Sequence, residues 1–266
     1  MSQEIIQQLR NDAKEWILEA GELIKESMNQ PFAVDTKKDR KDLVTEVDRR
    51  SEQFFIDKIS EKYPDHKVLG EEGMGEEVTS LDGTVWIIDP IDGTLNFVHQ
   101  QRFFAISIGI YIDGVGEVGF IYDVMADDLY EGVRHQGAYK NGTQLDPIDP
   151  QKTLEESMIG LNNTWVIPNR RLDEKKMQEL SRNVKGTRSY GSASLEFAYI
   201  ADGTLDAYIT MRLSPWDIAA GMIIVSEVGG VTTRVDGSEI GMLSGNTVVC
   251  ANQAIHQELL TYIIEK

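Results

Sequence analysis

The spacing of apolar residues predicts helices at the start of the chain. Between residues 3 and 28, apolar side chains recur three and four positions apart, which is typical of an amphipathic helix with one buried face. A second helix is expected over residues 48–63, with Phe54, Phe55 and Ile59 on its apolar face. The charged segment 35–42 contains the only basic cluster of the chain. It is expected to be either a solvated turn or a mobile lid that helps to admit an anion.

The pattern then changes to one typical of β-strands. Two dipeptides that favour hairpin turns, Asp113-Gly114 and Asn141-Gly142, lie among the apolar runs. We therefore predict a largely antiparallel sheet after the first two helices. Its strands are expected at residues 84–88, 103–112, 115–124, 129–134 and 138–145.

Strands and helices alternate beyond the proline-containing segment 146–150, which predicts a linker. The first half of the chain is therefore expected to be α+β and the second half α/β. We expect one compact unit made of two parts, residues 1–146 and residues 147–266. In the second part, strands are expected at 157–161, 205–210 and 247–251, and helices at 172–182, 194–201, 218–228 and 254–264.

Charge and composition exclude several classes of function. The chain has 266 residues, of which 44 are acidic and 26 basic, for a net charge of −18. This charge repels nucleic acid and anionic membranes, and it would also repel phosphorylated metabolites unless bound cations neutralised it. A single cysteine, Cys250, excludes an intrachain disulfide and a cysteine-rich zinc site. No secretory signal pattern and no apolar run of about 20 residues is found, so a cytoplasmic protein is expected.

The segment 86–98, with the sequence W-I-I-D-P-I-D-G-T-L-N-F-V, carries the most informative chemistry. Asp89 and Asp92 follow an apolar strand, and carboxylates are the ligands that Mg²⁺ or Ca²⁺ prefers. The carbonyl of Ile91 could complete a coordination sphere, and Gly93 allows close approach of a ligand. A helix starting after Gly93 would add N–H groups that bind an anion beside the metals. The alternative is an Asp-rich turn at the end of a strand.

Three further acidic segments are ambiguous when each is taken alone. The G-E-E-G sequence at 70–73 is typical of a solvated turn, and Asp217 could cap the helix that follows it. Thr45 or Asp48 could likewise cap the second helix. An EF-hand is excluded, because Ile91 and Gly93 stand where such a loop needs oxygen ligands.

Taken together, these segments resemble the inositol monophosphatase family, the lithium-sensitive Mg²⁺-dependent phosphatases. The resemblance implies a layered αβαβα sandwich with a metal site between the two halves of the chain. It also implies hydrolysis of small phosphomonoesters by a homodimer. The matching motifs are D-L-V-T-x-x-D (42–48), G-E-E (70–72), W-I-I-D-P-I-D-G-T-x-N-F-V-H (86–99), G-S-A (191–193) and P-W-D-x-A-A-G (215–221).

The same resemblance implies the metal ligands. Glu71, Asp89 and the Ile91 carbonyl would hold one Mg²⁺. Asp89, Asp92 and Asp217 would hold a second, and Glu71 would also touch a weaker third ion. Two or three metal ions are therefore expected.

The resemblance also implies how the reaction is carried out. The Thr94 hydroxyl, hydrogen-bonded to Asp48, would orient a metal-bound water and help to deprotonate it, with Glu71 assisting. The backbone N–H groups of Gly93 and Thr94 would hold the phosphate. Two metal ions can bind the attacking and leaving oxygens of a phosphoryl transfer, so this assignment is chemically consistent.

The alcohol part of the substrate is less well defined. Gly191, Ser192 and Ala193 resemble a family loop that contacts inositol hydroxyls. Many inositol-specific members carry a glutamate seven residues before the aspartate of the W-D motif, whereas this chain has Thr210. Arg188 and Arg212 are either surface residues or contacts for a second anionic group.

Several substrates therefore remain open. Inositol monophosphate is the first expectation. The alternatives are the 2′-phosphate of NADP(H), fructose 1,6-bisphosphate and 3′-phosphoadenosine 5′-phosphate. A hypothesis from another class is a non-catalytic regulatory protein that keeps the fold.

Overall fold

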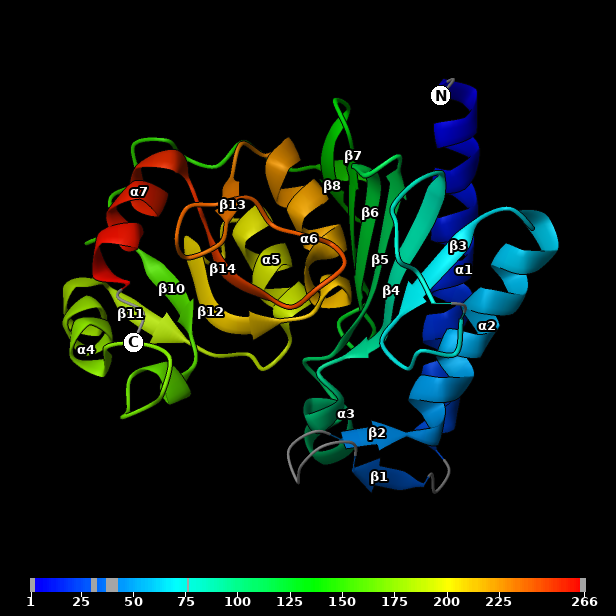
Figure 1. The fold of residues 1–266 in the computed structure, drawn as a ribbon, viewed down its shortest axis with the longest axis horizontal. Coiled ribbons are helices and arrows are strands. Elements are labelled where there is room, and N and C mark those ends of the chain that lie inside the picture. Colours follow the sequence, from blue (N-terminus) through cyan, green and yellow to red (C-terminus); the bar gives the residue numbers. More distant parts are fainter. Residues whose placement is uncertain (1–2, 30–32, 37–42, 76, 264–266) are drawn as a thin grey trace.

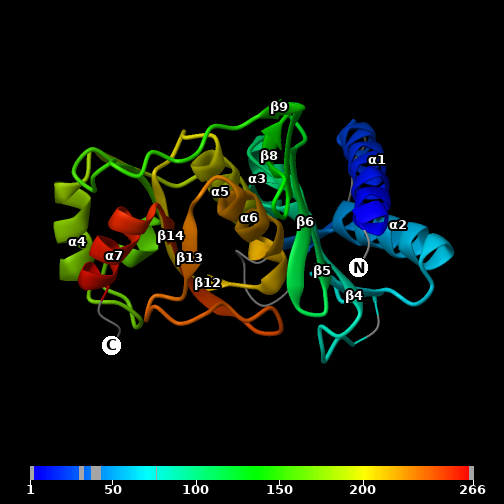
Figure 2. The ribbon, with the colours of Figure 1, turned by 90° about the horizontal axis from the view of Figure 1, so that it is seen from above.

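Five layers of helix and sheet alternate across the molecule (Figures 1 and 2). The computed structural model describes residues 3–29, 33–36, 43–75 and 77–263. The layered αβαβα sandwich expected from the family resemblance is confirmed. Among the described residues, the helices are α1 (Gln3–Ser27), α2 (Glu46–Lys62), α3 (Thr94–Gln100), α4 (Glu174–Asn183), α5 (Ala193–Ala201), α6 (Pro215–Glu227) and α7 (Gln253–Tyr262).

A seven-stranded sheet forms the second layer, with α1 and α2 on its outer face (Figure 2). Its neighbours are antiparallel except for the parallel pair β3–β4, so the predicted antiparallel character is correct. Every residue of β4 and β5 is buried, because helices cover both faces of the sheet. In spatial order the strands are β3 (Lys67–Gly70), β4 (Thr84–Asp92), β5 (Ala105–Ile112), β6 (Val115–Asp123), β7 (Asp128–Val133), β8 (Gly137–Lys140) and β9 (Thr143–Gln144).

A five-stranded mixed sheet forms the fourth layer, with α4 and α7 on its outer side (Figure 2). Strand β10 is parallel to both of its neighbours, whereas β14 is antiparallel to β12 and β13. In spatial order the strands are β11 (Gly186–Arg188), β10 (Met158–Leu161), β12 (Ala207–Leu213), β14 (Asn246–Ala251) and β13 (Val231–Thr233). A separate two-stranded ribbon consists of β1 (Val34–Thr36) and β2 (Leu43–Thr45).

The central helices α5 and α6 lie between the two sheets, and glycines of the seven-stranded sheet allow α6 to pack closely on it. A Cβ atom added at Gly109, Gly119 or Gly132 would lie within 2.8 Å of an atom of α6. Side chains at these positions would push the helix away from the sheet. This close packing brings the first turn of α6 toward the carboxyl end of β4, where the predicted metal ligands lie.

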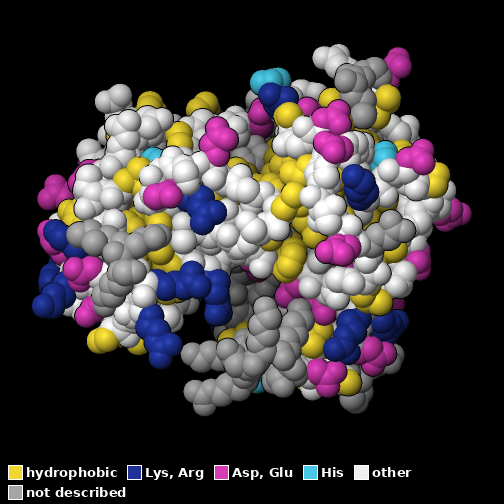
Figure 3. Space-filling model, viewed as in Figure 1, with side chains coloured by type: hydrophobic (Ala, Val, Ile, Leu, Met, Phe, Trp, Pro, Cys, Tyr) yellow, Lys and Arg dark blue, Asp and Glu magenta, His cyan; other side chains and the backbone are white. Residues whose placement is uncertain are grey.

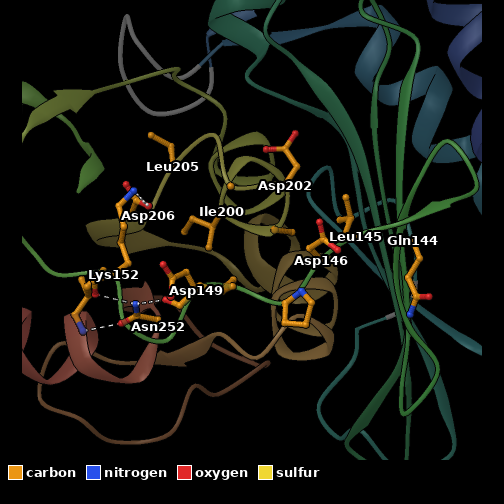
Figure 4. Close-up of a pocket in the computed structure, with 15 residues that line it drawn as sticks. Gln144, Leu145, Asp146, Asp149, Lys152, Ile200, Asp202, Leu205, Asp206 and Asn252 are labelled. Atoms are coloured by element: carbon orange, nitrogen blue, oxygen red, sulfur yellow. Dashed lines mark hydrogen bonds and ion pairs between the residues drawn. The ribbon is translucent and has the colours of Figure 1, made fainter. Parts of the chain in front are cut away.

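The segment 146–150 contains no helix or strand and connects the two sheets, as predicted for a linker. It is anchored, because Ile148 N donates to Val228 O at 2.8 Å and Asn252 Nδ2 donates to Asp149 O at 2.9 Å. The linker borders a cavity of about 340 Å³ whose acidic side chains include Asp202 and Asp206 (Figure 4). Both carboxylates are already paired with lysines of the same chain.

No helix among the described residues has the length and apolar character needed to cross a membrane.

Candidate active site

Strand β4 brings Asp89 and Asp92 to one side of the sheet. The sequence predicted that this strand ends at residue 88, but the structure continues it to Asp92. Asp89 pairs with Ser107 and Asp92 with Ala105, so three steps on β4 match two steps on β5. In a regular strand, residues three apart face opposite sides of the sheet. The extra residue is a β-bulge, which turns both carboxylates to the same side.

Asp217 joins this pair from the first turn of α6. The helix begins at Pro215, three residues earlier than predicted, so Ser214 is the N-cap and Asp217 is not. The Asp217 carboxylate accepts a hydrogen bond from Ser214 N at 2.6 Å, which completes a capping box. Carboxylate oxygens of Asp89, Asp92 and Asp217 lie within 4.8 Å of one another.

The carboxylates of this cluster repel one another. Burial, followed by the neighbouring charges of Glu71, Asp92 and Asp217, raises the pKa of Asp89 well above its usual range. Burial also raises the pKa of Asp92, although hydrogen bonds from Ser194 and Ser192 act in the opposite direction. Buried carboxylates that repel one another and offer hard oxygen donors fit a divalent cation, whose charge relieves the repulsion. Glu71 lies beside the cluster and lines the same cleft.

Thr94 and Asp48 are brought together next to the carboxylates. Thr94 Oγ1 lies 3.0 Å from Asp48 Oδ1 and 3.1 Å from the carbonyl oxygen of Ile91. Asp48 is buried at the start of α2, where it forms a capping box with Thr45. Both residues proposed as caps from the sequence therefore take part in the cap. Burial is the largest effect on the pKa of Asp48, and it raises that pKa.

Gly93 stands between β4 and α3 in a conformation that favours glycine. Its φ angle is 94°, and an added Cβ would lie 3.1 Å from Phe103 O and 3.3 Å from Gly191 O. Glycine therefore allows the start of α3 to approach the segment at residues 190–194. A helix does begin after Gly93, as the phosphate-binding hypothesis requires.

The segment at residues 190–194, which includes the first two residues of α5, supports the carboxylate cluster from the second half of the chain. Ser192 Oγ donates to Asp92 Oδ2 at 2.7 Å, and Ser194 N donates to the same oxygen at 2.6 Å. Ser192 also caps α5. The Ser192 side chain, expected to contact substrate hydroxyls, is thus engaged with a metal-ligand candidate. Gly191 and Ala193 line the cleft.

Two residues missed by the sequence analysis hold this segment in place. Asn96 Nδ2 donates to Phe103 O at 2.8 Å and to Tyr190 O at 2.7 Å, which links α3 to the segment. Glu196 accepts a hydrogen bond from Tyr190 N at 2.9 Å. It is only 3% exposed, and burial raises its pKa to about 7. A glutamate within the apolar helix predicted at 194–201 was the only sequence signal for it.

The site opens into a cleft of about 800 Å³ between the two halves of the molecule. Thr210 and Arg212 on β12 line this cleft, as does Arg171, whose guanidinium donates to Met211 O at 2.7 Å. Figure 3, drawn in the orientation of Figure 1, shows a hollow in the molecular surface with Lys and Arg side chains along one edge. Arg188 does not line the cleft. It is exposed and donates to the neighbouring Thr187 carbonyl, so the structure places it outside the site.

The proposed lid at residues 35–42 falls mainly outside the described part of the chain, because residues 37–42 are not described. Asp35 forms an ion pair with Arg49 at 3.2 Å, at the start of α2.

Comparison with known proteins gives one consistent family. A profile described as the inositol monophosphatase family matches residues 6–266. The inositol-1-monophosphatase of Bacillus subtilis (strain 168) is 51% identical over 247 residues, which cover 93% of each chain. The crystal structure of inositol monophosphatase-II from Staphylococcus aureus MSSA476 has 42% identity and a TM-score of 0.87, covering 96% of this chain and 92% of that one. A crystal structure of an IMPase/NADP phosphatase with Mg²⁺ and phosphate has 29% identity and a TM-score of 0.89, covering 97% and 95%.

Proposed function

The chain belongs to the inositol monophosphatase family, and on that premise we propose that it is a Mg²⁺-dependent phosphomonoester hydrolase that acts on inositol monophosphate. One observation carries the proposal. The carboxylates of Asp89, Asp92 and Asp217 lie within 4.8 Å of one another, and the hydrogen-bonded Thr94–Asp48 pair lies directly beside them. A crystal structure of a related phosphatase contains Mg²⁺ and phosphate, which supports Mg²⁺ as the metal.

We assign the carboxylates to two metal sites, as the family resemblance implies. Glu71, Asp89 and the Ile91 carbonyl would hold one Mg²⁺, and Asp89, Asp92 and Asp217 a second. Glu71 would also contact a weaker third ion. When bound, Mg²⁺ neutralises charge on the phosphate and lowers the pKa of the attacking water.

The Thr94–Asp48 pair would act on the attacking water. With its hydroxyl proton donated to Asp48 Oδ1, Thr94 Oγ1 has lone pairs that accept a hydrogen bond from water. As the water attacks phosphorus, its proton passes to Thr94 Oγ1 and the Thr94 proton passes to Asp48. Burial raises the pKa of Asp48, so its carboxylate accepts a proton more readily than an exposed aspartate would.

The phosphate and the alcohol would bind in different parts of the cleft. Backbone N–H groups of Gly93 and Thr94 at the start of α3 would hold the phosphate. Thr210 and Arg212 line the part of the cleft that belongs to the second half of the chain. We therefore assign residues 1–146 to most of the metal chemistry and residues 147–266 to Asp217 and the alcohol pocket.

A second candidate substrate class is favoured by the arginines of the cleft. Arg171 and Arg212 both line it, and two guanidinium groups suit a second anionic group. NADP(H), fructose 1,6-bisphosphate and 3′-phosphoadenosine 5′-phosphate all carry one. Lithium sensitivity and a homodimer stay predictions from the family resemblance, and a cytoplasmic location stays a prediction from the sequence.

Phosphate release from a substrate panel tests the proposal. Inositol 1-phosphate, NADP⁺, fructose 1,6-bisphosphate and 3′-phosphoadenosine 5′-phosphate would each be assayed with Mg²⁺ and with EDTA. We expect Mg²⁺-dependent hydrolysis of inositol 1-phosphate. Phosphate release that persists in EDTA would contradict the metal assignment. Absence of release from every substrate would favour a non-catalytic regulatory protein.

A further inference from the structure

We propose that Glu52 is a positioning residue that holds the loop carrying Glu71 in the geometry needed to bind metal. Glu52 lies on α2, one helical turn after Asp48, and its exposed fraction is 0%. The inference rests on the proposed function, because it takes Glu71 to be a metal ligand. Glu52 lies outside all of the sequence motifs that match the family.

The contacts of Glu52 are directed at the loop after β3. Its two carboxylate oxygens accept hydrogen bonds from different backbone groups, Glu72 N at 2.7 Å and Met74 N at 2.8 Å. These two residues follow Glu71 in the chain. A side chain that bridges both N–H groups restrains the backbone that carries the Glu71 side chain.

Gly70 shows that the fit between Glu52 and this loop is close. A Cβ atom added at Gly70 would lie 2.4 Å from the Cδ and Oε2 atoms of Glu52. Any side chain at residue 70 would displace the carboxylate, so glycine is needed here to let it reach the loop. Gly70, the residue before Glu71, therefore leaves the space that the Glu52 carboxylate occupies.

Helix α2 would then support the site at two points. Its first turn presents Asp48 to Thr94, and its second turn presents Glu52 to the loop of Glu71. Both side chains are almost fully buried, which is costly for a carboxylate unless hydrogen bonds compensate. The arrangement links the group that activates water and a metal ligand to one rigid helix.

Mn²⁺ binding to the purified protein without substrate tests the role of Glu52. Free Mn²⁺ can be followed by electron paramagnetic resonance during titration. We expect Glu52→Gln to weaken Mn²⁺ affinity about 10–100-fold, the range found when a residue that orients a metal ligand is replaced. The Mg²⁺ concentration needed for half-maximal hydrolysis should rise, while kcat at saturating Mg²⁺ returns toward that of the parent.

Glu227 provides a matched control. It also accepts one backbone N–H on each carboxylate oxygen, from His135 at 2.9 Å and Gly137 at 2.8 Å, but it does not line the cleft. Glu227→Gln should lower thermal stability without changing Mn²⁺ affinity. If Glu52→Gln does not fold, Gly70→Ala perturbs the same contact and should also weaken binding.

Asp89→Asn separates failure of this inference from failure of the proposed function. Loss of Mn²⁺ binding in Asp89→Asn together with parental affinity in folded Glu52→Gln or Gly70→Ala would overturn the positioning role alone. Parental affinity in Asp89→Asn as well would show that the metal site itself is wrongly assigned. Equal losses in Glu52→Gln and Glu227→Gln would indicate a general effect of stability and would also overturn the positioning role.

Discussion

Two parts of the cleft differ in how deeply their charged side chains are buried. The part proposed to carry the metal chemistry, called the metal wall, comprises Asp48, Asp89, Asp92, Thr94 and Asp217. The part proposed to bind the alcohol, called the alcohol wall, comprises Thr210, Arg212 and Arg171. Asp48, Asp89 and Asp92 of the metal wall are buried, and hydrogen bonds orient their carboxylates. In the alcohol wall Thr210 is buried, whereas Arg212 and Arg171 are exposed. The proposed chemistry is therefore placed on buried carboxylates, whereas the proposed choice of substrate depends on Thr210 and on two exposed arginines.

The largest effects are expected from the carboxylates of the metal wall. Asp89→Asn and Asp217→Asn should each lower kcat/KM by about 10³-fold or more, because bound metal supplies several kcal/mol of charge stabilisation and each 1.4 kcal/mol is tenfold. Circular dichroism should show that both variants remain folded. Normal turnover by either folded variant would refute the assignment of that residue as a metal ligand.

The Thr94–Asp48 pair should give the next largest effects. Thr94→Ala should slow the chemical step about 10²–10⁴-fold, the usual contribution of positioned proton transfer. Asp48→Asn should act on the same step. Because the two residues work as a unit, the double variant should be much more active than the product of the single losses implies. Strictly multiplicative losses in kcat would show that the residues act independently.

Glu196, which also lines the cleft, is expected to make stability depend on pH. Its folded-state pKa is raised to about 7 from 4.5, so the folded protein keeps a proton that the unfolded chain has already lost. The contribution of Glu196 to the free energy of unfolding therefore falls by about 3 kcal/mol as the pH rises from about 4.5 to about 7.

Urea unfolding in EDTA at several pH values would measure this contribution. Relative to the parent, Glu196→Gln should gain about 3 kcal/mol in the free energy of unfolding between pH 4.5 and pH 8. Parallel pH profiles for the parent and the variant would show that Glu196 does not keep its proton in the folded protein.

The smallest effect is expected in the alcohol wall, where Thr210→Glu should change selectivity. A glutamate accepts strong hydrogen bonds from ring hydroxyls, worth roughly 1.5–3 kcal/mol, or about 10–150-fold in kcat/KM. The added charge should disfavour substrates with a second phosphate. The ratio of kcat/KM for inositol 1-phosphate to that for NADP⁺ should therefore rise.

Arg188→Ala is the control for this experiment, because Arg188 lies outside the cleft. It should leave the ratio unchanged, whereas Arg212→Ala should weaken hydrolysis of NADP⁺ more than that of inositol 1-phosphate. A Thr210→Glu variant with the parental ratio would remove residue 210 from the determinants of selectivity.

Local features of the metal wall could be predicted from the sequence, whereas features that depend on strand pairing could not. The motifs of the metal wall are local, and the long helices and strands that carry them follow from apolar periodicity. The β-bulge between Asp89 and Asp92 could not be predicted, because it depends on how β4 pairs with β5. The short strands β1, β2, β11 and β13 were missed for a similar reason, since three residues carry too little pattern.

Contacts between residues far apart in the sequence could not be predicted either. Glu52 and Glu196 bind backbone groups in loops that lie near them only in the folded chain. The direction of an arginine side chain is also a tertiary property. Arg188 and Arg212 are equivalent in the sequence, but only Arg212 lines the cleft, and Arg171, which also lines it, lies outside every motif.

The separation of chemistry from substrate choice can be tested in one measurement. It consists of kcat/KM values for inositol 1-phosphate, NADP⁺ and fructose 1,6-bisphosphate in the parent and in Thr94→Ala. If the metal wall performs the same step on every substrate, all three values should fall by the same factor, within about 10²–10⁴-fold, and their ratios should stay as in the parent. A change of tenfold or more in any ratio would contradict the account, because Thr94 would then take part in selecting the alcohol.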